Sequence, residues 1–384
     1  MPSLVPRALP PRLYITAWPR PLSQGAAARG LAELGAPRGK PPWRVLFFGT
    51  DDFAAESLRA LEATREPREE PLIDRLEVVT LPSPLPRGPP VKNCAQQFQL
   101  PTHHWPDTGP SGQFDVGVVA SFGRLLNEDL ILQFPYGVLN VHPSYLPRWR
   151  GPAPIVHAVL HGDTVTGVTI MQIKPKRFDV GPIIKQERYA VPSQCTAKEL
   201  EAILSKLGAN MLISVLKNLP ESLKNKREQP NEGVTFAPKV TIAMSCIKWE
   251  EQTPEQILRL HRAIGATLPL QTLWMGNTVK LLDFVEVHNI CSFADQLLNE
   301  HGIVPGSVLY HKSSETLVVL LTVFKTVILK KKLTAADFYN GYLHAWFQQK
   351  TLHGDCRFHT LKLTTVKKTE RKGNGGAQYK TKSA

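Results

Sequence analysis

Residues 136–151 read YGVLNVHPSYLPRWRG, an apolar run that ends in Asn140-Val141-His142 and passes into a turn rich in proline and arginine. The apolar start predicts a buried strand, and on a strand the side chains of residues i and i+2 point to the same face. Asn140 and His142 therefore project side by side where the strand ends, which is where α/β proteins place their ligands. An amide donor beside an imidazole can stabilise an oxyanion and move a proton, so this stretch predicts the floor of an active site.

Strand and helix patterns alternate on both sides of this stretch. Further apolar runs predict strands at residues 44–50, 76–80, 114–122 and 168–171. Helical patterns lie between the strands, at residues 53–61, 91–98, 125–132 and 154–160. The alternation predicts an α/β fold with a mainly parallel sheet and crossover helices.

The chain divides into a first domain at 41–219, a linker at 220–235 and a second domain at 236–350. The first domain closes with a long apolar helix that starts at the capping box of Thr196 and Glu199. Polar, turn-forming residues then predict the linker. The second domain opens with a capped helix and continues in β-forming segments at 270–275, 278–287, 306–310 and 317–329, which predict a small β-barrel. Residues 351–384 are expected to be a basic disordered tail.

The net charge of +13 is held mostly by the two ends of the chain. Residues 1–40 carry six basic residues and one acidic residue, and residues 357–384 carry eight and one, so the remainder is close to neutral. A basic, acid-poor leader is typical of an organelle transit peptide. The alternative is a disordered N-terminal extension that carries no targeting signal. Contacts of the folded body with a polyanion must therefore come from local patches.

Several function classes are excluded by motifs that the sequence lacks. The five cysteines never form a Cys-x-x-Cys pair, which argues against a disulfide framework or a zinc knuckle and favours a reducing compartment. No apolar run approaches the roughly 18 residues of a membrane helix, so no membrane partner is expected. No G-x-G-x-x-G follows the strand at 44–50, which excludes a nicotinamide-dependent dehydrogenase.

Three motifs together resemble the 10-formyltetrahydrofolate-dependent formyltransferases. They are Asn140-Val141-His142, the Ser-Tyr-Leu-Pro run at 144–147, and Asp179-Val180-Gly181. The family pattern is Asn-x-His, then Ser-Leu-Leu-Pro, then a distant Asp-x-Gly. The resemblance covers residues 43–347 and is most specific across 114–187. With the basic leader, the chain is most similar to the vertebrate mitochondrial members that act on methionyl-tRNA.

The resemblance implies a Rossmann-like first domain, an OB-like second domain that binds tRNA, and a defined reaction. The formyl group of 10-formyltetrahydrofolate would pass to the α-amino group of initiator methionyl-tRNA in the mitochondrial matrix, by direct amine attack without an acyl-enzyme or a metal. Asn140 and His142 would donate hydrogen bonds to the oxyanion. Asp179 would fix the imidazole tautomer and help to remove the proton. We expect a monomer.

The resemblance also assigns binding residues. The folate would contact two loops, formed by Phe122, Gly123 and Arg124 and by Ser144, Tyr145, Leu146 and Pro147. Basic side chains would bind the tRNA phosphates, namely Arg87, Lys92, Arg148, Arg150, Lys330, Lys331 and Lys332. The alternatives are a solvated loop or an ion pair with Asp163 for the two arginines at 148 and 150, and a solvated surface for the lysine run.

Four features depart from the family pattern. Pro143 stands where the bacterial tRNA enzymes usually have Gly, and Tyr145 replaces the first Leu of Ser-Leu-Leu-Pro. The loop at 81–92 is short and weakly basic, and residues 317–329 lack the expected Asp-Gly hairpin. Three other functions stay open: a formyltransferase with another amine acceptor such as an amino-sugar nucleotide, a formyltetrahydrofolate hydrolase, and a noncatalytic RNA-binding protein.

Overall fold

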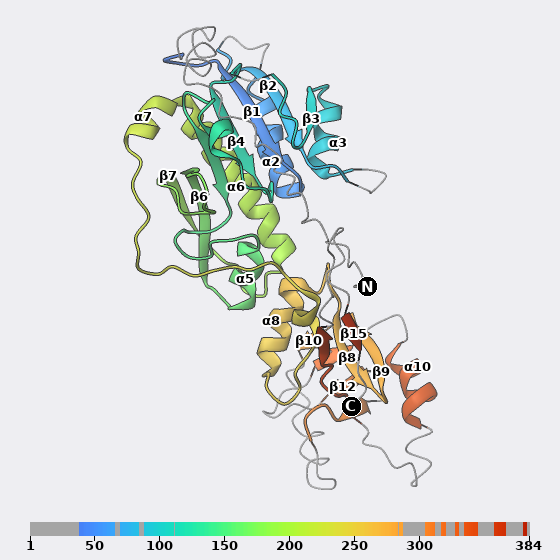
Figure 1. The fold of residues 1–384 in the computed structure, drawn as a ribbon. Coiled ribbons are helices and arrows are strands. Elements are labelled where there is room, and N and C mark those ends of the chain that lie inside the picture. Colours follow the sequence, from blue (N-terminus) through green and yellow to red (C-terminus); the bar gives the residue numbers. More distant parts are fainter. Residues whose placement is uncertain are drawn as a thin grey trace, which may run out of the picture.

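The computed structural model describes residues 38–65, 70–83, 88–110, 112–282, 284–286, 304–311, 316–319, 327–329, 334–344, 357–365 and 379–381. These residues form an upper α/β body and a lower body rich in strands (Figure 1). Of the features predicted from the sequence, residues 1–37 of the leader, Arg87 and the lysines at 330–332 lie outside the described residues.

A seven-stranded sheet in the order β3-β2-β1-β4-β5-β6-β7 forms the centre of the upper body. Its strands are β1 (Trp43–Gly49), β2 (Ile73–Thr80), β3 (Thr102–His104), β4 (Val116–Ala120), β5 (Val138–His142), β6 (Val165–Gln172) and β7 (Ile183–Ala190). The first five strands in this order pair in parallel, whereas β6 and β7 are antiparallel to their neighbours. The predicted mainly parallel sheet is therefore confirmed.

Among the described residues, six helices accompany the sheet: α2 (Asp52–Glu62), α3 (Pro90–Gln97), α4 (Glu128–Ile131), α5 (Pro154–Leu160), α6 (Ala197–Lys217) and α7 (Leu219–Lys224). The capping box predicted for the long helix α6 is present, with Thr196 and Glu199 each satisfying a backbone N–H of the other. α6 packs against α2 and crosses β5. Gly208 permits this close crossing, because a Cβ atom there would lie 2.8 Å from Cγ1 of Val141. The helix thus supports the strand that carries Asn140 and His142.

Side chains along β5 alternate between the two faces of the sheet. Leu139 and Val141 belong to the hydrophobic cluster under α2 and α6, together with Val45 and Phe47 of β1. Val138 belongs to the cluster on the opposite face. Because strand side chains alternate, Asn140 and His142 share that opposite face, as the sequence predicts.

The lower body is rich in antiparallel strands, as predicted. It contains a 3-10 turn (Ile242–Ser245), α8 (Pro254–Ile264), β8 (Leu270–Trp274), β9 (Asn277–Leu281), β10 (Phe284–Glu286), β11 (Val308–His311), β12 (Thr316–Val319), β13 (Val327–Leu329), α10 (Ala335–Phe338), a π-helical turn (Tyr339–Leu343), β14 (Leu363–Thr365) and β15 (Tyr379–Thr381). The described strands form sheets β10-β13-β12-β11, β8-β9 and β14-β15 and do not close into a barrel, so closure stays a prediction.

The structure bears on two expectations for the lower body, one for residues 317–329 and one for the tail from residue 351. In the segment at 317–329, which lacks the Asp-Gly signal of the family hairpin, β12 and β13 pair antiparallel, with residues 320–326 outside the described part. The prediction of disorder from residue 351 does not hold for residues 357–361. Phe358 and Leu361 are buried there, because these apolar side chains complete the lower core despite the basic composition around them.

The two bodies are joined by packing as well as by the chain. One hydrophobic cluster runs from the sheet through Ile257 and Leu260 of α8 to Trp274 and Phe358 of the lower body. The connecting segment leaves α7, descends past β7 and β6, and enters α8 (Figure 1). Arg227 of this segment exchanges backbone hydrogen bonds with Ile183 of β7, at 2.7 and 2.9 Å. The predicted linker thus lies against the sheet.

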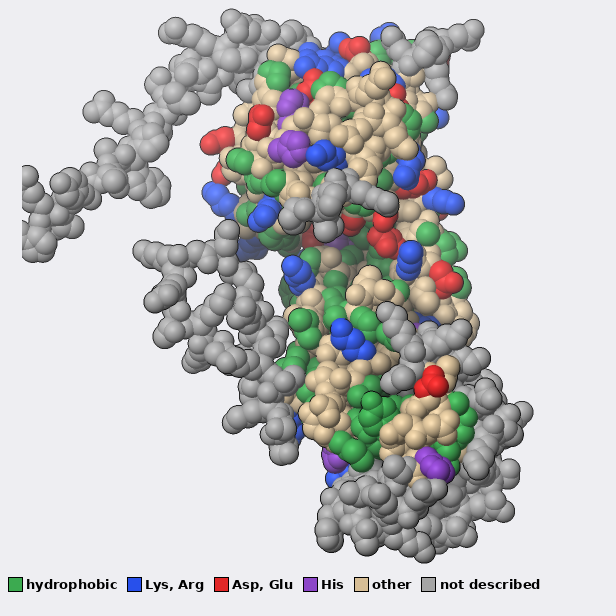
Figure 2. Space-filling view, turned by 90° about the vertical axis from the view of Figure 1, so that its right-hand side faces the viewer, with side chains coloured by type: hydrophobic (Ala, Val, Ile, Leu, Met, Phe, Trp, Pro, Cys, Tyr) green, Lys and Arg blue, Asp and Glu red, His purple; other side chains and the backbone are tan. Residues whose placement is uncertain are grey.

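The described surface is of mixed charge on the face drawn in Figure 2. Basic and acidic side chains are interspersed over the upper body, and hydrophobic side chains gather on part of the lower body (Figure 2). Among the described residues, no helix combines the length and the apolar character needed to cross a membrane.

Candidate active site

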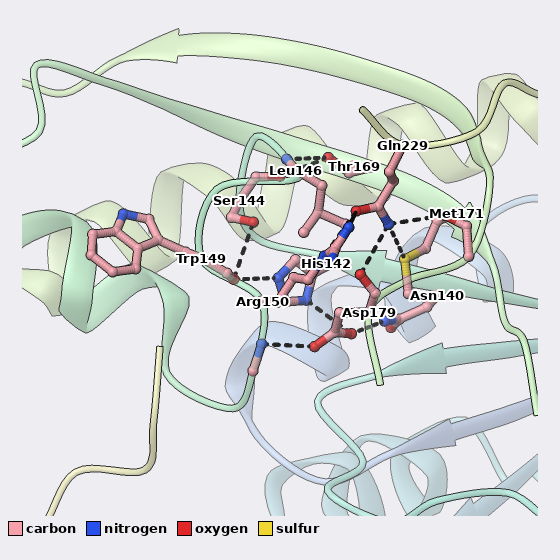
Figure 3. A network of polar contacts seen from close by, with 12 residues as sticks. Asn140, His142, Ser144, Leu146, Trp149, Arg150, Thr169, Met171, Asp179 and Gln229 are labelled. Atoms are coloured by element: carbon pink, nitrogen blue, oxygen red, sulfur yellow. Dashed lines mark hydrogen bonds and ion pairs between the residues drawn. The ribbon is translucent and has the colours of Figure 1, made fainter. Parts of the chain in front are cut away.

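The turn after β6 brings Asp179 to the end of β5, where Asn140 and His142 lie (Figure 3). Oδ1 of Asp179 is 3.2 Å from the amide nitrogen of Asn140 and 3.6 Å from Nδ1 of His142. His142 is 5% exposed and Asp179 is 8% exposed. The structure therefore brings Asp179, which is remote in sequence, to Asn140 and His142 in a largely buried site.

The second carboxylate oxygen of Asp179 is bound by the chain beyond β5. The backbone N–H of Gly151 donates to Oδ2 at 2.8 Å. Asp179 has a φ of +54°, in the left-handed region that non-glycine residues seldom occupy. The surrounding hydrogen bonds hold this backbone in place, which is the usual setting of a strained residue at a functional site.

Both ring nitrogens of His142 face acceptors. Nε2 lies 2.9 Å from the carbonyl oxygen of Trp149, and Nδ1 faces the carboxylate of Asp179. The contact with the carbonyl needs a proton on Nε2, because the carbonyl oxygen can only accept. In this arrangement neither nitrogen of His142 points an unused N–H at a substrate.

The turn that carries the predicted folate contacts is anchored from below by β6 and β7. The hydroxyl of Thr169 donates to the carbonyl of Ser144 at 2.7 Å, and the amide of Gln186 donates to the carbonyl of Leu146 at the same distance. The Ser144 hydroxyl donates to the carbonyl of Arg148 at 2.8 Å. The turn over the site is thus fixed by hydrogen bonds to neighbouring strands.

An ion pair stabilises the next part of this turn. The guanidinium of Arg148 bonds both carboxylate oxygens of Asp163, and the indole N–H of Trp149 donates to Oδ2 of the same residue at 2.7 Å. The guanidinium also lies over the indole ring of Trp149, with its central carbon 4.3 Å from the ring centroid. The ion-pair alternative for Arg148 is therefore what the structure contains, and its contact with tRNA stays a prediction.

Arg150 is engaged within the site by Gln229 of the connecting segment. Its guanidinium donates two hydrogen bonds to the Gln229 side-chain oxygen, at 2.7 and 3.1 Å (Figure 3). Burial lowers the pKa of Arg150, and the nearby Asp179 charge opposes that shift. A tRNA contact for Arg150 stays a prediction too.

The remaining predicted binding residues fall into two groups. Phe122, Ser144 and Leu146 are buried, and Phe122 packs edge-on against Phe48 and Trp105. Their side chains hold the loops in place, so any folate contact would come from the loop backbone or from more exposed neighbours. Those neighbours are Gly123 and Arg124, which are exposed, and Tyr145 and Pro147, which are half-buried. Lys92 is half-buried on α3.

Tyr145, a departure from the family pattern, has a specific partner. The guanidinium of Arg188 on β7 lies 4.8 Å from the centre of its ring, a cation–π contact. No sequence signal pointed to Arg188, Gln186, Thr169 or Gln229, because each acts through a partner distant in the chain. Among the described residues, no group of three His, Cys, Asp or Glu side chains is placed to hold a metal.

Two family models match the chain. The model of the formyl transferases matches residues 103–216, and that of the formyl transferase C-terminal domain matches residues 239–343. The mitochondrial methionyl-tRNA formyltransferase of Homo sapiens is 64% identical over 92% of this chain and 96% of its own length. That of Mus musculus is 67% identical over 85% and 86%. The methionyl-tRNA formyltransferase of Neisseria meningitidis is 36% identical over 60% and 77%.

Solved structures share the fold at low sequence identity. One is an N-formyltransferase of Helicobacter canadensis in complex with folinic acid and dTDP-3-aminofucose, with a TM-score of 0.54, 15% identity and coverage of 75% of this chain and 99% of that chain. Another is WlaRD, a sugar 3N-formyl transferase, with a TM-score of 0.51, 14% identity and coverage of 75% and 97%. At this identity the likeness concerns the fold alone.

Proposed function

This chain belongs to the methionyl-tRNA formyltransferase family, and on that premise we propose that it transfers the formyl group of 10-formyltetrahydrofolate to the α-amino group of initiator methionyl-tRNA. The observation that carries the proposal is the convergence of Asn140, His142 and Asp179 at the end of β5. The acceptor is supported by relatives that are 64–67% identical over most of the chain. Those relatives are mitochondrial, which supports the same location and a role in translation initiation there.

The proposed reaction moves one carbon between two nitrogens. The neutral amine attacks the formyl carbon, and the carbonyl π electrons move onto oxygen to give a tetrahedral oxyanion. The bond from that carbon to N10 of the folate then breaks. One proton leaves the attacking nitrogen and one arrives at N10, so that atoms and charge balance without a covalent enzyme intermediate.

Asn140 is the residue that we assign to the oxyanion. Its amide nitrogen carries two hydrogens, and only one of them is used by the contact with Asp179. The other is available at the site where the negative charge develops. A fixed donor at such a position typically contributes on the order of 10²–10³ in rate.

We assign the proton transfer to the pair of His142 and Asp179. The carboxylate accepts the proton of the attacking amine, and the imidazole shares and stabilises that proton through Nδ1. Direct donation from His142 to the oxyanion, the expectation from the sequence, requires that its ring leave the carbonyl of Trp149. The turn that supplies this carbonyl therefore decides which role the imidazole has.

Two of the alternatives share the formyl donor and differ in the acceptor, and the third is a protein without catalysis. One experiment separates all of them. Purified protein is mixed with 10-formyltetrahydrofolate and either charged initiator tRNA, an amino-sugar nucleotide or no acceptor. We expect N-formylmethionyl-tRNA in the first mixture and no turnover in the others. Formylated sugar would indicate a different acceptor, and free formate without acceptor would indicate a hydrolase. Binding of tRNA with no product in any mixture would indicate a noncatalytic RNA-binding protein.

A further inference from the structure

Gln229 is the one inward-facing residue in an exposed part of the connecting segment. Residues 224–228 and 230–233 are all exposed, whereas Gln229 is half-buried. Its position lies between the two segments matched by the family models, which end at residue 216 and resume at residue 239. A side chain that turns inward from such a stretch has partners worth identifying.

Those partners all belong to the candidate active site (Figure 3). The amide nitrogen of Gln229 donates to the backbone carbonyls of Asp179 and Gly181, each at 2.9 Å. It also lies 3.8 Å from the sulfur of Met171. Its amide oxygen accepts both hydrogen bonds of Arg150. One side chain therefore joins the turn after β6 to the turn after β5.

The segment that carries Gln229 is fastened on both sides of it. On one side, Arg227 pairs with Ile183 of β7 through two backbone hydrogen bonds. On the other side, Arg150 donates its N–H to the carbonyl of Thr235 and accepts from Ala237 through its own carbonyl, at 2.9 and 2.7 Å. Gln229 is thereby held at a fixed distance from the Asp179 turn.

The Asp179 turn needs such support. Asp179 occupies a left-handed backbone conformation, which aspartate adopts more readily than most residues with a side chain but which is still uncommon outside glycine. Residues 173–182 between β6 and β7 lack regular secondary structure, so no ladder of sheet hydrogen bonds holds the carbonyl of Asp179. The two bonds from Gln229 supply that restraint on the backbone, while Gly151, Asn140 and His142 orient the carboxylate.

We propose that Gln229 is a positioning residue for Asp179, acting through the backbone of the turn that presents the carboxylate to the reacting amine. The proposal rests on the proposed function, because it needs Asp179 to take part in proton transfer. It also assigns the connecting segment a part in the chemistry: the chain that leads to the second domain sets the geometry of the catalytic turn.

The test compares Gln229→Met and Gln229→Glu with a matched control. Methionine keeps the length of the side chain and removes all of its strong hydrogen bonds. Glutamate keeps an acceptor for Arg150 and removes the two donated bonds. The control is Gln271→Met, since Gln271 is also half-buried and donates one bond, at 2.9 Å, to the hydroxyl of Ser245 in the lower body.

We expect both Gln229 variants to lower kcat about tenfold or more, because small displacements of catalytic groups have effects of this size or larger. The KM values for both substrates should stay within about threefold, since Gln229 is not assigned to substrate binding. Gln271→Met should keep the wild-type kcat. A near-normal kcat in Gln229→Glu would show that the bond with Arg150, and not the two donated bonds, is what matters, and it would overturn the proposal. So would a loss in Gln229→Met that is fully matched by a lower folded fraction.

A double-mutant cycle separates this proposal from the proposed function. If Gln229 acts through Asp179, adding Gln229→Met to Asp179→Ala should change the single-turnover rate by less than about twofold. An independent tenfold loss in that background would overturn the positioning role. Full activity of Asp179→Ala alone would instead overturn the assignment of the site, whereas an inactive Asp179→Ala beside a normal Gln229→Met would overturn only the present inference.

Discussion

The backbone nitrogen of Gly151 lies 2.8 Å from Oδ2 of Asp179, so the turn after β5 binds the carboxylate carried by the turn after β6. Gly151 has a φ of +117°, and a Cβ atom there would lie 2.8 Å from the carbonyl oxygen of Ala237. The position therefore accepts only glycine without a shift of the connecting segment.

Gly151→Ala should lower both stability and activity. Backbone strain of this kind costs on the order of 1–3 kcal/mol in the free energy of unfolding. The displaced N–H should also lower kcat/KM on the order of 10²-fold, as expected for misplaced catalytic groups. Thermal unfolding and initial-rate measurements test this. The control is Gly276→Ala, at a φ of +76° with no atom within 4 Å of the added Cβ, which should cost stability and leave the rate unchanged.

Asn140→Ala and Asp179→Ala should fold and lose formyl transfer. Removal of one oxyanion donor costs on the order of 10²–10³ in kcat, and loss of the proton acceptor should cost on the order of 10²–10⁴. Rapid-quench measurement of N-formylmethionyl-tRNA gives the single-turnover rate, and circular dichroism checks the fold. Near-normal turnover in either variant would contradict the assignment of these residues.

Asp163→Asn should loosen the turn at 148–149 by weakening the bonds from Arg148 and Trp149. Hydrogen bonds to charged groups contribute about 1.5–3 kcal/mol, so we expect a loss of about 2 kcal/mol in the free energy of unfolding. Urea titration measures it. As a control, Glu228→Gln removes the exposed ion pair with Lys174 and should cost less than about 0.5 kcal/mol. Equal effects of the two substitutions would show that the Asp163 cluster is no stronger than a surface pair.

Stability should fall as the pH is lowered from 7.5 to 5, in part through His157. Burial lowers the pKa of this histidine, whose Nδ1 has no hydrogen-bond partner in the structure. The unfolded chain therefore takes up a proton near the ordinary value of about 6.5, while the folded chain takes it up only at lower pH. The stabilisation linked to His157 is therefore fully present above the ordinary pKa. It is lost as the pH falls towards the lowered pKa of His157 in the folded protein.

His157→Gln should reduce this acid sensitivity, because glutamine can still donate to the carbonyl of Pro238, which lies 3.0 Å from Nε2 of the histidine. Urea titrations at several pH values give the slope of the free energy of unfolding for each protein. The exposed His104→Gln variant serves as the control and should follow the wild-type slope. An unchanged slope in His157→Gln would assign the acid sensitivity to other groups.

Much of the fold could be predicted from local patterns in the sequence. Apolar runs located β1, β4 and β5, and the capping box at Thr196 located α6, because these signals are contained in a few consecutive residues. β3 (Thr102–His104) was missed, since it is three residues long and contains a threonine and two histidines. Its strand conformation comes from pairing with β2, which no local pattern records.

The candidate site also has parts that local sequence patterns predict and parts that they do not. The shared face of Asn140 and His142 followed from strand geometry, whereas the approach of Asp179 rested on the family pattern. The acceptor opposite Nε2 of His142 could not be anticipated, because it is a backbone carbonyl of Trp149, and every residue has such a group. Gln229 was included in a segment predicted only as a linker, since polar composition does not distinguish a solvated chain from one that pairs with β7.

The segment between the two bodies pairs with β7 through Arg227 and with the turn after β5 through Thr235 and Ala237. Exchange of the C-terminal half between related enzymes should therefore succeed only when the crossover point lies beyond residue 238. A chimera joined at residue 219 would place the connecting segment of another enzyme against its own catalytic site. The part of the chain that must be kept together for catalysis is thus longer than the first domain alone.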